Sequence, residues 1–151
     1  MVKELIGSVF ESKAQTLVNP VNCVGVMGKG LALEFKKRYP AMFDDYAERC
    51  ARKQVRLGEP YLFRDRSGTL IVNFPTKDNW RSPSRLADIE HGLDYFVQPH
   101  AQWGIESVAF PQLGCGNGGL SWEDVGPLIF SKLQDLKIEI EVCLPAKCLQ
   151  P

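Results

Sequence analysis

The sequence lacks an excess of either charge. Its 18 lysines and arginines balance 18 aspartates and glutamates, and its isoelectric point is about 6.7. A protein that attracts nucleic acid through its overall field carries a clear positive excess. The balance excludes such a field and leaves a local basic patch as the electrostatic route to nucleic acid.

Paired cysteines and long apolar runs are also missing. The cysteines at 23, 50, 115, 143 and 148 are odd in number and form no Cys-x-x-Cys pair. This pattern disfavours a disulfide framework or a zinc site and fits a reducing compartment. There is neither a signal-peptide core nor a run of membrane-spanning length. We therefore expect a cytoplasmic protein without membrane contact, in which residues 1–151 form one domain.

What the sequence does contain is an alternation of strand and helix patterns. Continuous apolar or β-branched runs predict buried strands, and apolar side chains at helical spacing predict helices. The expected strands cover residues 2–7, 16–19, 60–65, 69–74, 108–110 and 138–144. The expected helices cover residues 30–39, 40–53 and 83–100, with a last helix after Ser121. This order predicts an α/β fold with a mixed sheet between helices.

Prolines and small polar residues set the expected boundaries. Pro20 should end the second strand, and the pair Ser82-Pro83 reads as an N-cap and a first-turn proline. Ser121 with Asp124 resembles a capping box. Pro127 then fits only if the regular helix begins near it.

Three loops follow the ends of expected strands, at 22–30, 75–82 and 111–119. In α/β sheets, ligands bind at the carboxyl ends of the strands. The loop 111–119 has four glycines among nine residues, and 22–30 is also rich in glycine. Because glycine lets main-chain N–H groups converge on an anion, these loops predict a phosphate site. Their spacing matches neither the P-loop nor GxGxxG, so a plain connection is the alternative.

The same loops resemble the macrodomain family, an ADP-ribose-binding fold with three α/β/α layers. The sequence VNPVN at 18–22 followed by MGKGLA at 27–32 is similar to the family's first ligand loop, and 111–119 stands where the family has its diphosphate loop. The stretch NFPTKDNWR at 73–81 resembles the branch that contains the terminal ADP-ribose glycohydrolase and the DarG antitoxins. The resemblance covers essentially the whole chain.

This resemblance implies a set of ligand contacts. Asn22 would bond the distal ribose, which suits a carboxamide because it donates and accepts. The alternative role of Asn22 is that of a turn residue, and Asn19 would hold the strand end. The other implied ADP-ribose contacts are Ser8, Val9, Val26, Met27, Gly28, Gly30, Leu31, Thr76, Leu113, Gly114, Cys115, Gly116, Asn117, Gly118 and Gly119.

The resemblance also implies that Lys77 acts in catalysis together with Asn22. A lysine beside anions can stabilise an oxyanion, and a desolvated lysine can lose its proton and attack the anomeric carbon. The alternative is a solvated loop lysine.

Two positions depart from the family pattern. Gly7-Ser8 stands where the family often has Gly-Asp, so adenine recognition would fall to the Ser8 hydroxyl or to a main-chain amide near Val9. Gly118 stands where the human terminal ADP-ribose glycohydrolase carries a catalytic aspartate. A lysine–aspartate pair is therefore not available in that form.

Three further residues are candidates for contact with DNA: Trp80, Arg81 and Arg85. An aromatic ring can stack on an unpaired base, and arginine can bind phosphate. The alternative is local packing with a surface ion pair.

Taken with the resemblance, these residues predict a monomeric ADP-ribosyl glycohydrolase that removes ADP-ribose from thymidine bases in single-stranded DNA. It would need no metal or other cofactor, and its implied partner is an ADP-ribosyltransferase toxin. The chain would be either a piece of a longer antitoxin or a stand-alone relative. Two alternatives stay open: a hydrolase acting on ADP-ribosylated acidic protein side chains, and a module that binds ADP-ribose without cleaving it.

Overall fold

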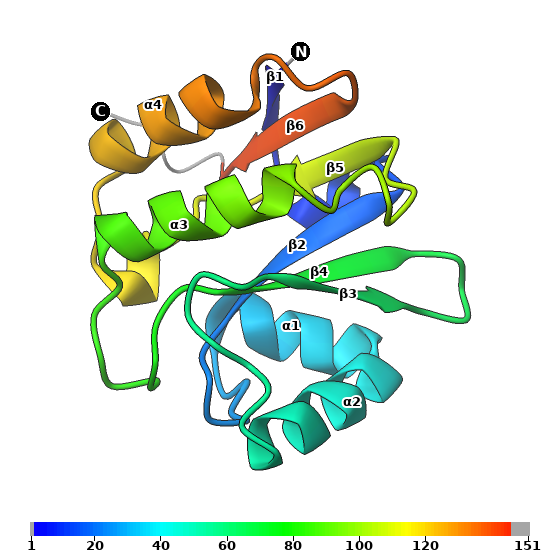
Figure 1. Cartoon of the computed structure of the whole chain (residues 1–151), viewed down its shortest axis with the longest axis vertical. Helices are drawn as coiled ribbons and strands as arrows, with labels where there is room; N and C mark the ends of the chain where they lie inside the picture. The colour runs from blue at the N-terminus through cyan, green and yellow to red at the C-terminus, as the bar shows by residue number, and fades with distance from the viewer. Residues whose placement is uncertain (1, 146–151) are drawn as a thin grey trace.

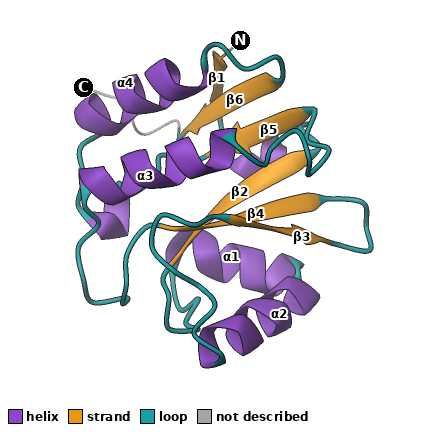
Figure 2. Cartoon of the chain, viewed as in Figure 1, coloured by secondary structure: helices purple, strands orange, loops and turns teal. Residues whose placement is uncertain are grey.

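The computed structural model describes residues 2–145 as a six-stranded sheet flanked by four helices (Figures 1 and 2). The strands are β1 (Val2–Ile6), β2 (Thr16–Val21), β3 (Tyr61–Arg64), β4 (Leu70–Pro75), β5 (Ser107–Phe110) and β6 (Glu139–Leu144). The helices are α1 (Gly30–Arg38), α2 (Pro40–Ala51), α3 (Leu86–Val97) and α4 (Trp122–Leu133). Cys148 lies outside the described residues.

The sheet is parallel except at one edge. Its order is β1-β6-β5-β2-β4-β3, and only β3 runs antiparallel, paired with β4 through a hairpin. The carboxyl ends of β2, β4 and β5 therefore meet at one edge of the sheet. This mixed sheet within three layers confirms the predicted fold class.

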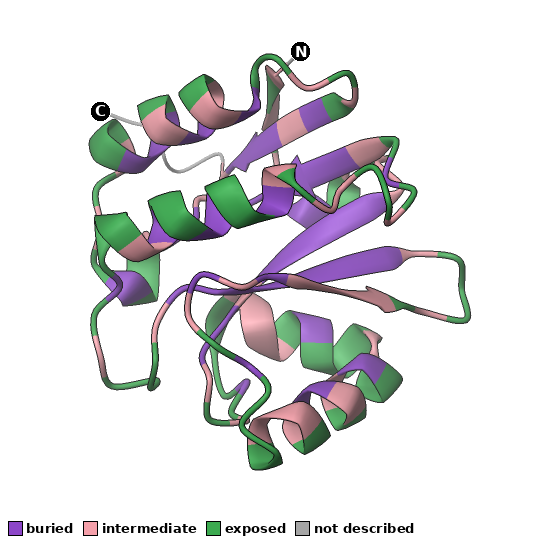
Figure 3. Cartoon of the chain, viewed as in Figure 1, coloured by how far each residue is buried: buried purple, intermediate pink, exposed green. Residues whose placement is uncertain are grey.

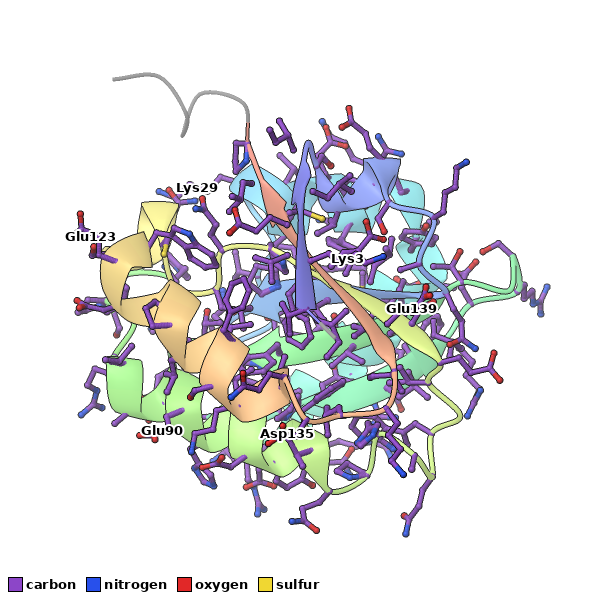
Figure 4. The ribbon with its side chains drawn as sticks, turned by 90° about the horizontal axis from the view of Figure 1, so that it is seen from above. Lys3, Lys29, Glu90, Glu123, Asp135 and Glu139 are labelled. Atoms are coloured by element: carbon purple, nitrogen blue, oxygen red, sulfur yellow. The ribbon has the colours of Figure 1, made fainter. Side chains whose placement is uncertain are left out.

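Each face of the sheet carries its own core. Along β4, Leu70, Val72 and Phe74 pack toward α3 and α4, whereas Ile71 packs toward α1 and α2. This alternation follows from the two-residue period of a strand, and it makes β4 buried along its whole length. Figure 3 shows the result: buried central strands, and helices striped by buried and exposed residues. In Figure 4, Glu90 on α3 and Glu123 on α4 point outward, away from the sheet.

The boundary expected at Pro20 is wrong, because β2 continues to Val21. The main-chain oxygen of Val21 accepts a bond from the N–H of Thr76 on the β4 side, so Pro20 turns its nitrogen toward β5. The pairing of β2 with β5 ends at Leu17, opposite Ala109. The missing N–H of Pro20 therefore faces a position where no neighbouring strand would accept a hydrogen bond from it.

The start expected for the third helix is also wrong. Helix α3 begins at Leu86 with Arg85 as its N-cap, four residues after Ser82. The N–H of Ser84 donates to the carbonyl of Gly118 at 2.9 Å, which ties this segment to the loop 111–119. The chain can therefore enter the helix only after Ser84.

Helix α4 begins at Trp122 rather than near Pro127, which lies inside it. The Ser121 hydroxyl accepts from the N–H of Glu123 at 3.1 Å, one residue earlier than in the expected capping box. Pro127 cannot bond the carbonyl of Glu123, but both residues are exposed, so water can satisfy that oxygen.

No helix within residues 2–145 is both long and apolar enough to cross a membrane.

Candidate functional site

A cleft of about 450 Å³ lies where the three predicted loops meet, beyond the ends of β2, β4 and β5. Its volume is in the range of small-molecule sites. Of the predicted ligand and DNA contacts, those that line it are Asn22, Val26, Met27, Gly28, Leu31, Thr76, Lys77, Trp80, Gly114, Cys115, Asn117 and Gly118. The topology therefore brings together residues from all three loops.

Asn22 organises the first loop as well as facing the cleft. Its Nδ2 donates to the carbonyl of Val26 at 2.8 Å, and its Oδ1 accepts from the N–H of Val24 at 3.0 Å. The buried hydroxyl of Tyr46 lies 2.6 Å from the same Oδ1, and burial raises the pKa of Tyr46, so this hydroxyl stays a donor. One N–H of the Asn22 carboxamide is left for a ligand. The side chain thus has the turn role, and its ribose contact stays a prediction.

A series of hydrogen-bonded polar side chains lies beneath the cleft, beside Asn22. Asn19 donates to Asn73 Oδ1 at 3.0 Å, and Asn73 donates to the hydroxyl of Tyr61 at 3.2 Å. The Nδ2 of Asn19 also lies 3.9 Å from the sulfur of Met27, which is 2% exposed. These bonds give Asn19 the structural role expected of it and hold Met27 in place.

Lys77 enters the cleft directly after β4. Its half-buried side chain reaches the carbonyls of Trp80 at 3.3 Å and Asn117 at 3.5 Å, so it spans two of the three loops. Desolvation lowers the pKa of Lys77, and the nearby charge of Lys29 lowers it further. Lys77 is therefore a held and partly desolvated amine rather than a freely solvated one.

The loop 111–119 folds into a tight turn that only glycine fits easily. Gly114, Gly116 and Gly119 have φ of 73°, 66° and 83°, in the left-handed region that side chains disfavour. Gly116 and Gly119 are exposed but do not line the cleft as it stands. Leu113 is fully buried in the core on the α3 and α4 face, so it anchors the loop from below and also does not line the cleft.

The predicted DNA contacts separate into two groups. Trp80 is 44% exposed at the cleft, and the guanidinium of Arg81 lies 4.5 Å over its ring. Arg85 instead pairs with Asp88 at 3.6 Å and borders a second cavity of about 240 Å³. Lys77 lines both cavities.

Besides Leu113, Gly116 and Gly119, three further predicted ADP-ribose contacts do not line the cleft: Ser8, Val9 and Gly30. Val9 is 1% exposed in the core on the α1 and α2 face, and the Ser8 hydroxyl accepts from the N–H of Phe10 at 3.0 Å in a capping box with Glu11. Gly30 faces Asn117, since a Cβ on it would lie 3.0 Å from Asn117 Nδ2. Adenine recognition at Ser8 and Val9 stays a prediction.

Several lining residues were not predicted: Pro20, Val21, Lys29, Ala32, Ser84, Pro111 and Gln112. Most of them adjoin a predicted residue at a strand end or in the helix after the first loop, so the strand boundaries could have found them. Ser84 carries no such signal, because only the fold brings it against Gly118. Within residues 2–145, no group of three or more His, Cys, Asp or Glu side chains is placed to hold a metal ion.

Comparison with known proteins agrees with this geometry. The Macro domain family matches residues 18–129. The DNA ADP-ribosyl glycohydrolase of Mycobacterium tuberculosis is 48% identical over 135 residues, covering 86% of this chain and 38% of that protein. A DNA ADP-ribosyl transferase-DNA ADP-ribosyl glycohydrolase fusion protein of Thermosipho africanus is 38% identical over 157 residues, covering 92% of this chain and 40% of that protein. The chain thus spans about two fifths of the length of these relatives.

Two solved structures match along nearly the whole chain. The macrodomain of M. tuberculosis DarG has a TM-score of 0.93 and 43% identity, with 97% of this chain and 99% of that chain covered. The T. africanus DarTG in complex with ADP-ribose has a TM-score of 0.91 and 38% identity, with 99% of this chain and 43% of that chain covered. These matches confirm the predicted resemblance to the DarG branch, and the chain belongs to the Macro domain family.

Proposed function

We propose that this protein is an ADP-ribosyl glycohydrolase that removes ADP-ribose from thymidine bases in single-stranded DNA. The observation that carries the proposal is Lys77, a partly desolvated amine held across the cleft between the carbonyls of Trp80 and Asn117. The names of the M. tuberculosis and T. africanus relatives support the reaction class, and the ADP-ribose complex of the latter supports the ligand.

In this proposal each loop has one task. Main-chain N–H groups around Gly114 and Gly118 bind the diphosphate, and the remaining N–H of Asn22 bonds the distal ribose. Lys77 then lies beside the anomeric carbon. The bond from that carbon to the base nitrogen breaks; water supplies the hydroxyl to the carbon and a proton to the nitrogen.

Two roles for Lys77 fit this cleavage. As an ammonium it stabilises negative charge that develops near the departing base. As a neutral amine it attacks the anomeric carbon, and water releases the intermediate in a second step. Common glycosidases use a pair of carboxylates. Position 118 cannot supply a carboxylate, because the chain has glycine there. Neither role requires a metal or cofactor, so we expect activity in the presence of a chelator.

The proposed partner is an ADP-ribosyltransferase toxin that makes the substrate. The T. africanus relative combines a DNA ADP-ribosyl transferase and a glycohydrolase in one protein. A transferase that attaches ADP-ribose to DNA and a hydrolase that removes it act on the same bond. We therefore expect this protein and its toxin partner to act on the same DNA.

A protein substrate with ADP-ribose on acidic side chains would use the same cleft. The feature that favours DNA is the exposed Trp80 ring under the Arg81 guanidinium, because a planar stack at the mouth suits a base and a phosphate. The partly desolvated Lys77 favours a hydrolase over a module that only binds ADP-ribose, because it supplies a group that can act on the anomeric carbon.

The test is base release from an ADP-ribosylated thymidine oligonucleotide by the wild type, by Lys77→Ala and by Lys37→Ala. Lys37 is an exposed lysine on α1, so its loss controls for removal of one positive charge. We expect release by the wild type and by Lys37→Ala, and a loss of at least 100-fold in Lys77→Ala, since removing one charge-stabilising group costs about 10²–10³ in rate. No release by the wild type would refute the activity. Release by Lys77→Ala at the wild-type rate would refute only the role of the lysine.

A further inference from the structure

The cleft contains one buried hydroxyl that has no partner in the described part of the chain. Ser84 is 5% exposed, and its Oγ has no hydrogen-bond partner among residues 2–145. A buried hydroxyl left unpaired destabilises a fold, so native proteins seldom keep one without a reason. Ser84 lines the cleft together with Lys77 and Trp80. Its hydroxyl is therefore a buried polar group directly beside the cleft wall.

The glycine at 118 makes room for this hydroxyl. A Cβ at Gly118 would lie 2.5 Å from Ser84 Oγ and 3.0 Å from Ser84 Cβ. Any side chain at 118 would thus occupy the position that the Ser84 hydroxyl now takes. At this point the side-chain polar group of the cleft wall is the Ser84 hydroxyl, which comes from the loop between β4 and α3. Gly118, on the turn itself, supplies no side chain there.

Lys77 and Ser84 donate hydrogen bonds to successive residues of the same turn. The ammonium of Lys77 donates to the carbonyl of Asn117, and the main-chain N–H of Ser84 donates to the carbonyl of Gly118. The Ser84 side chain also lies against Gly118, since a Cβ there would be 2.5 Å from Ser84 Oγ, so the two side chains lie near neighbouring residues of the turn. If Lys77 lies beside the anomeric carbon and the diphosphate lies at Gly114 and Gly118, the distal ribose lies between them and within reach of Ser84. The hydroxyls of this ribose can both donate and accept.

We propose that the Ser84 hydroxyl hydrogen-bonds the distal ribose of ADP-ribose and positions it against Lys77. The inference rests on the proposed function for its ligand, but it assigns a residue that the sequence motifs did not indicate. Serine suits the position because its hydroxyl can rotate from the Gly118 side toward a ribose hydroxyl. Ligand binding then satisfies the group that the free protein leaves unpaired.

Calorimetric titration with ADP-ribose and with ADP, which lacks the distal ribose, tests this assignment. The proteins are the wild type, Ser84→Ala and Ser82→Ala; Ser82 lies on the same loop but borders the second cavity. Ser84→Ala keeps the main-chain bond to Gly118 and removes only the hydroxyl. We expect it to bind ADP-ribose about threefold to tenfold more weakly, the loss typical of one hydrogen bond. ADP affinity and Ser82→Ala should be unchanged.

Thermal unfolding of the free proteins separates this role from a structural one. Removing an unpaired buried hydroxyl should leave the Tm of Ser84→Ala equal to or above that of the wild type, while the Tm increase caused by ADP-ribose shrinks. Unchanged ADP-ribose affinity in Ser84→Ala, or an equal loss for ADP, would overturn the assignment. A wild type that binds no ADP-ribose would instead overturn the proposed function on which it rests.

Discussion

At the scale of single residues, the polar groups that line the cleft differ in how many hydrogen bonds they make within the described chain. Asn22 is tied to Val24, Val26 and Tyr46 and keeps one N–H in reserve, whereas the Ser84 hydroxyl has no partner in the described chain. Lys77 is intermediate, since it is bonded to two carbonyls and still desolvated. Such partly satisfied groups cost stability in the free protein and gain their partners when a ligand binds.

The lowered pKa of Lys77 gives a prediction that separates its two roles. The second cause of the shift is Lys29, so Lys29→Ala should raise the pKa of Lys77. The basic inflection in the pH profile of kcat should then move to higher pH. Through that inflection the rate rises with pH if the neutral amine attacks, because deprotonation creates the nucleophile. It falls with pH if the ammonium stabilises charge.

The profile is measured at saturating oligonucleotide in the wild type and in Lys29→Ala, with Lys37→Ala as the control for a lost surface charge. An inflection that stays in place, or moves to lower pH, in Lys29→Ala would contradict the electrostatic coupling between the two lysines.

At the scale of elements, close contact between α3 and β4 positions the Lys77 loop. Gly92 lies on the buried face of α3, and a methyl group there would collide with the ring of Phe74 on β4. Because β4 leads directly into Thr76 and Lys77, the distance from α3 to the sheet sets where this loop leaves the core.

We predict that Gly92→Ala lowers the free energy of unfolding. Overpacking of this kind costs about 1–3 kcal/mol, which exceeds or offsets the roughly 1 kcal/mol by which alanine is the better helix former. Gly126→Ala in α4 is the matched control: its Cβ would meet the half-exposed indole of Trp122 at 3.0 Å, and that ring can shift. Urea unfolding should show Gly92→Ala clearly less stable than Gly126→Ala. Equal stability of the two variants would show that α3 is free to move away from β4.

The sequence predicted the elements themselves well, for a physical reason. Strands buried on both faces, such as β4, read as continuous apolar runs, and α3 has clear helical spacing from Leu86 onward. The wrong boundaries depended on tertiary contacts. Pro20 is tolerated because β5 has already separated from β2, and the start of α3 is delayed by the bond from Ser84 to Gly118. No local pattern reports either contact.

The same distinction applies to the cleft. Motif resemblance located most of the lining, because glycines and amides at strand ends are visible in the sequence. The expected contact of Leu113 is through its main chain and stays a prediction, whereas its side chain belongs to the core. An apolar residue inside a motif does not reveal which way its side chain faces. Ser84 was missed because its relevance depends on Gly118, a residue on a different loop.

At the scale of the whole molecule, the charge balance limits how a DNA substrate, as proposed, could be bound. The sequence carries 18 residues of each sign, so no general field attracts the phosphate backbone. Around the cleft, Arg85 is already paired with Asp88, whereas Arg81 lies over Trp80 at the exposed mouth. We therefore expect the protein to recognise its substrate through the ADP-ribose in the cleft and through one stacked base with its phosphate. It should not depend on many contacts along the DNA backbone.

This arrangement predicts a weak dependence of DNA binding on salt. For single strands the logarithm of the binding constant falls with log salt by about 0.7 per phosphate contacted, so one or two contacts give a slope of about −0.7 to −1.4. Binding of the ADP-ribosylated oligonucleotide to a Lys77→Ala protein, which should turn it over at least 100-fold more slowly, can be measured by fluorescence anisotropy at several salt concentrations. Arg81→Ala should flatten the slope by about 0.7, while Arg85→Ala should leave it nearly unchanged because Asp88 already neutralises that charge. A slope several times steeper, or an equal effect of the two arginines, would mean that the DNA follows a basic surface beyond the cleft, and the stacked pair of Trp80 and Arg81 would lose its special role.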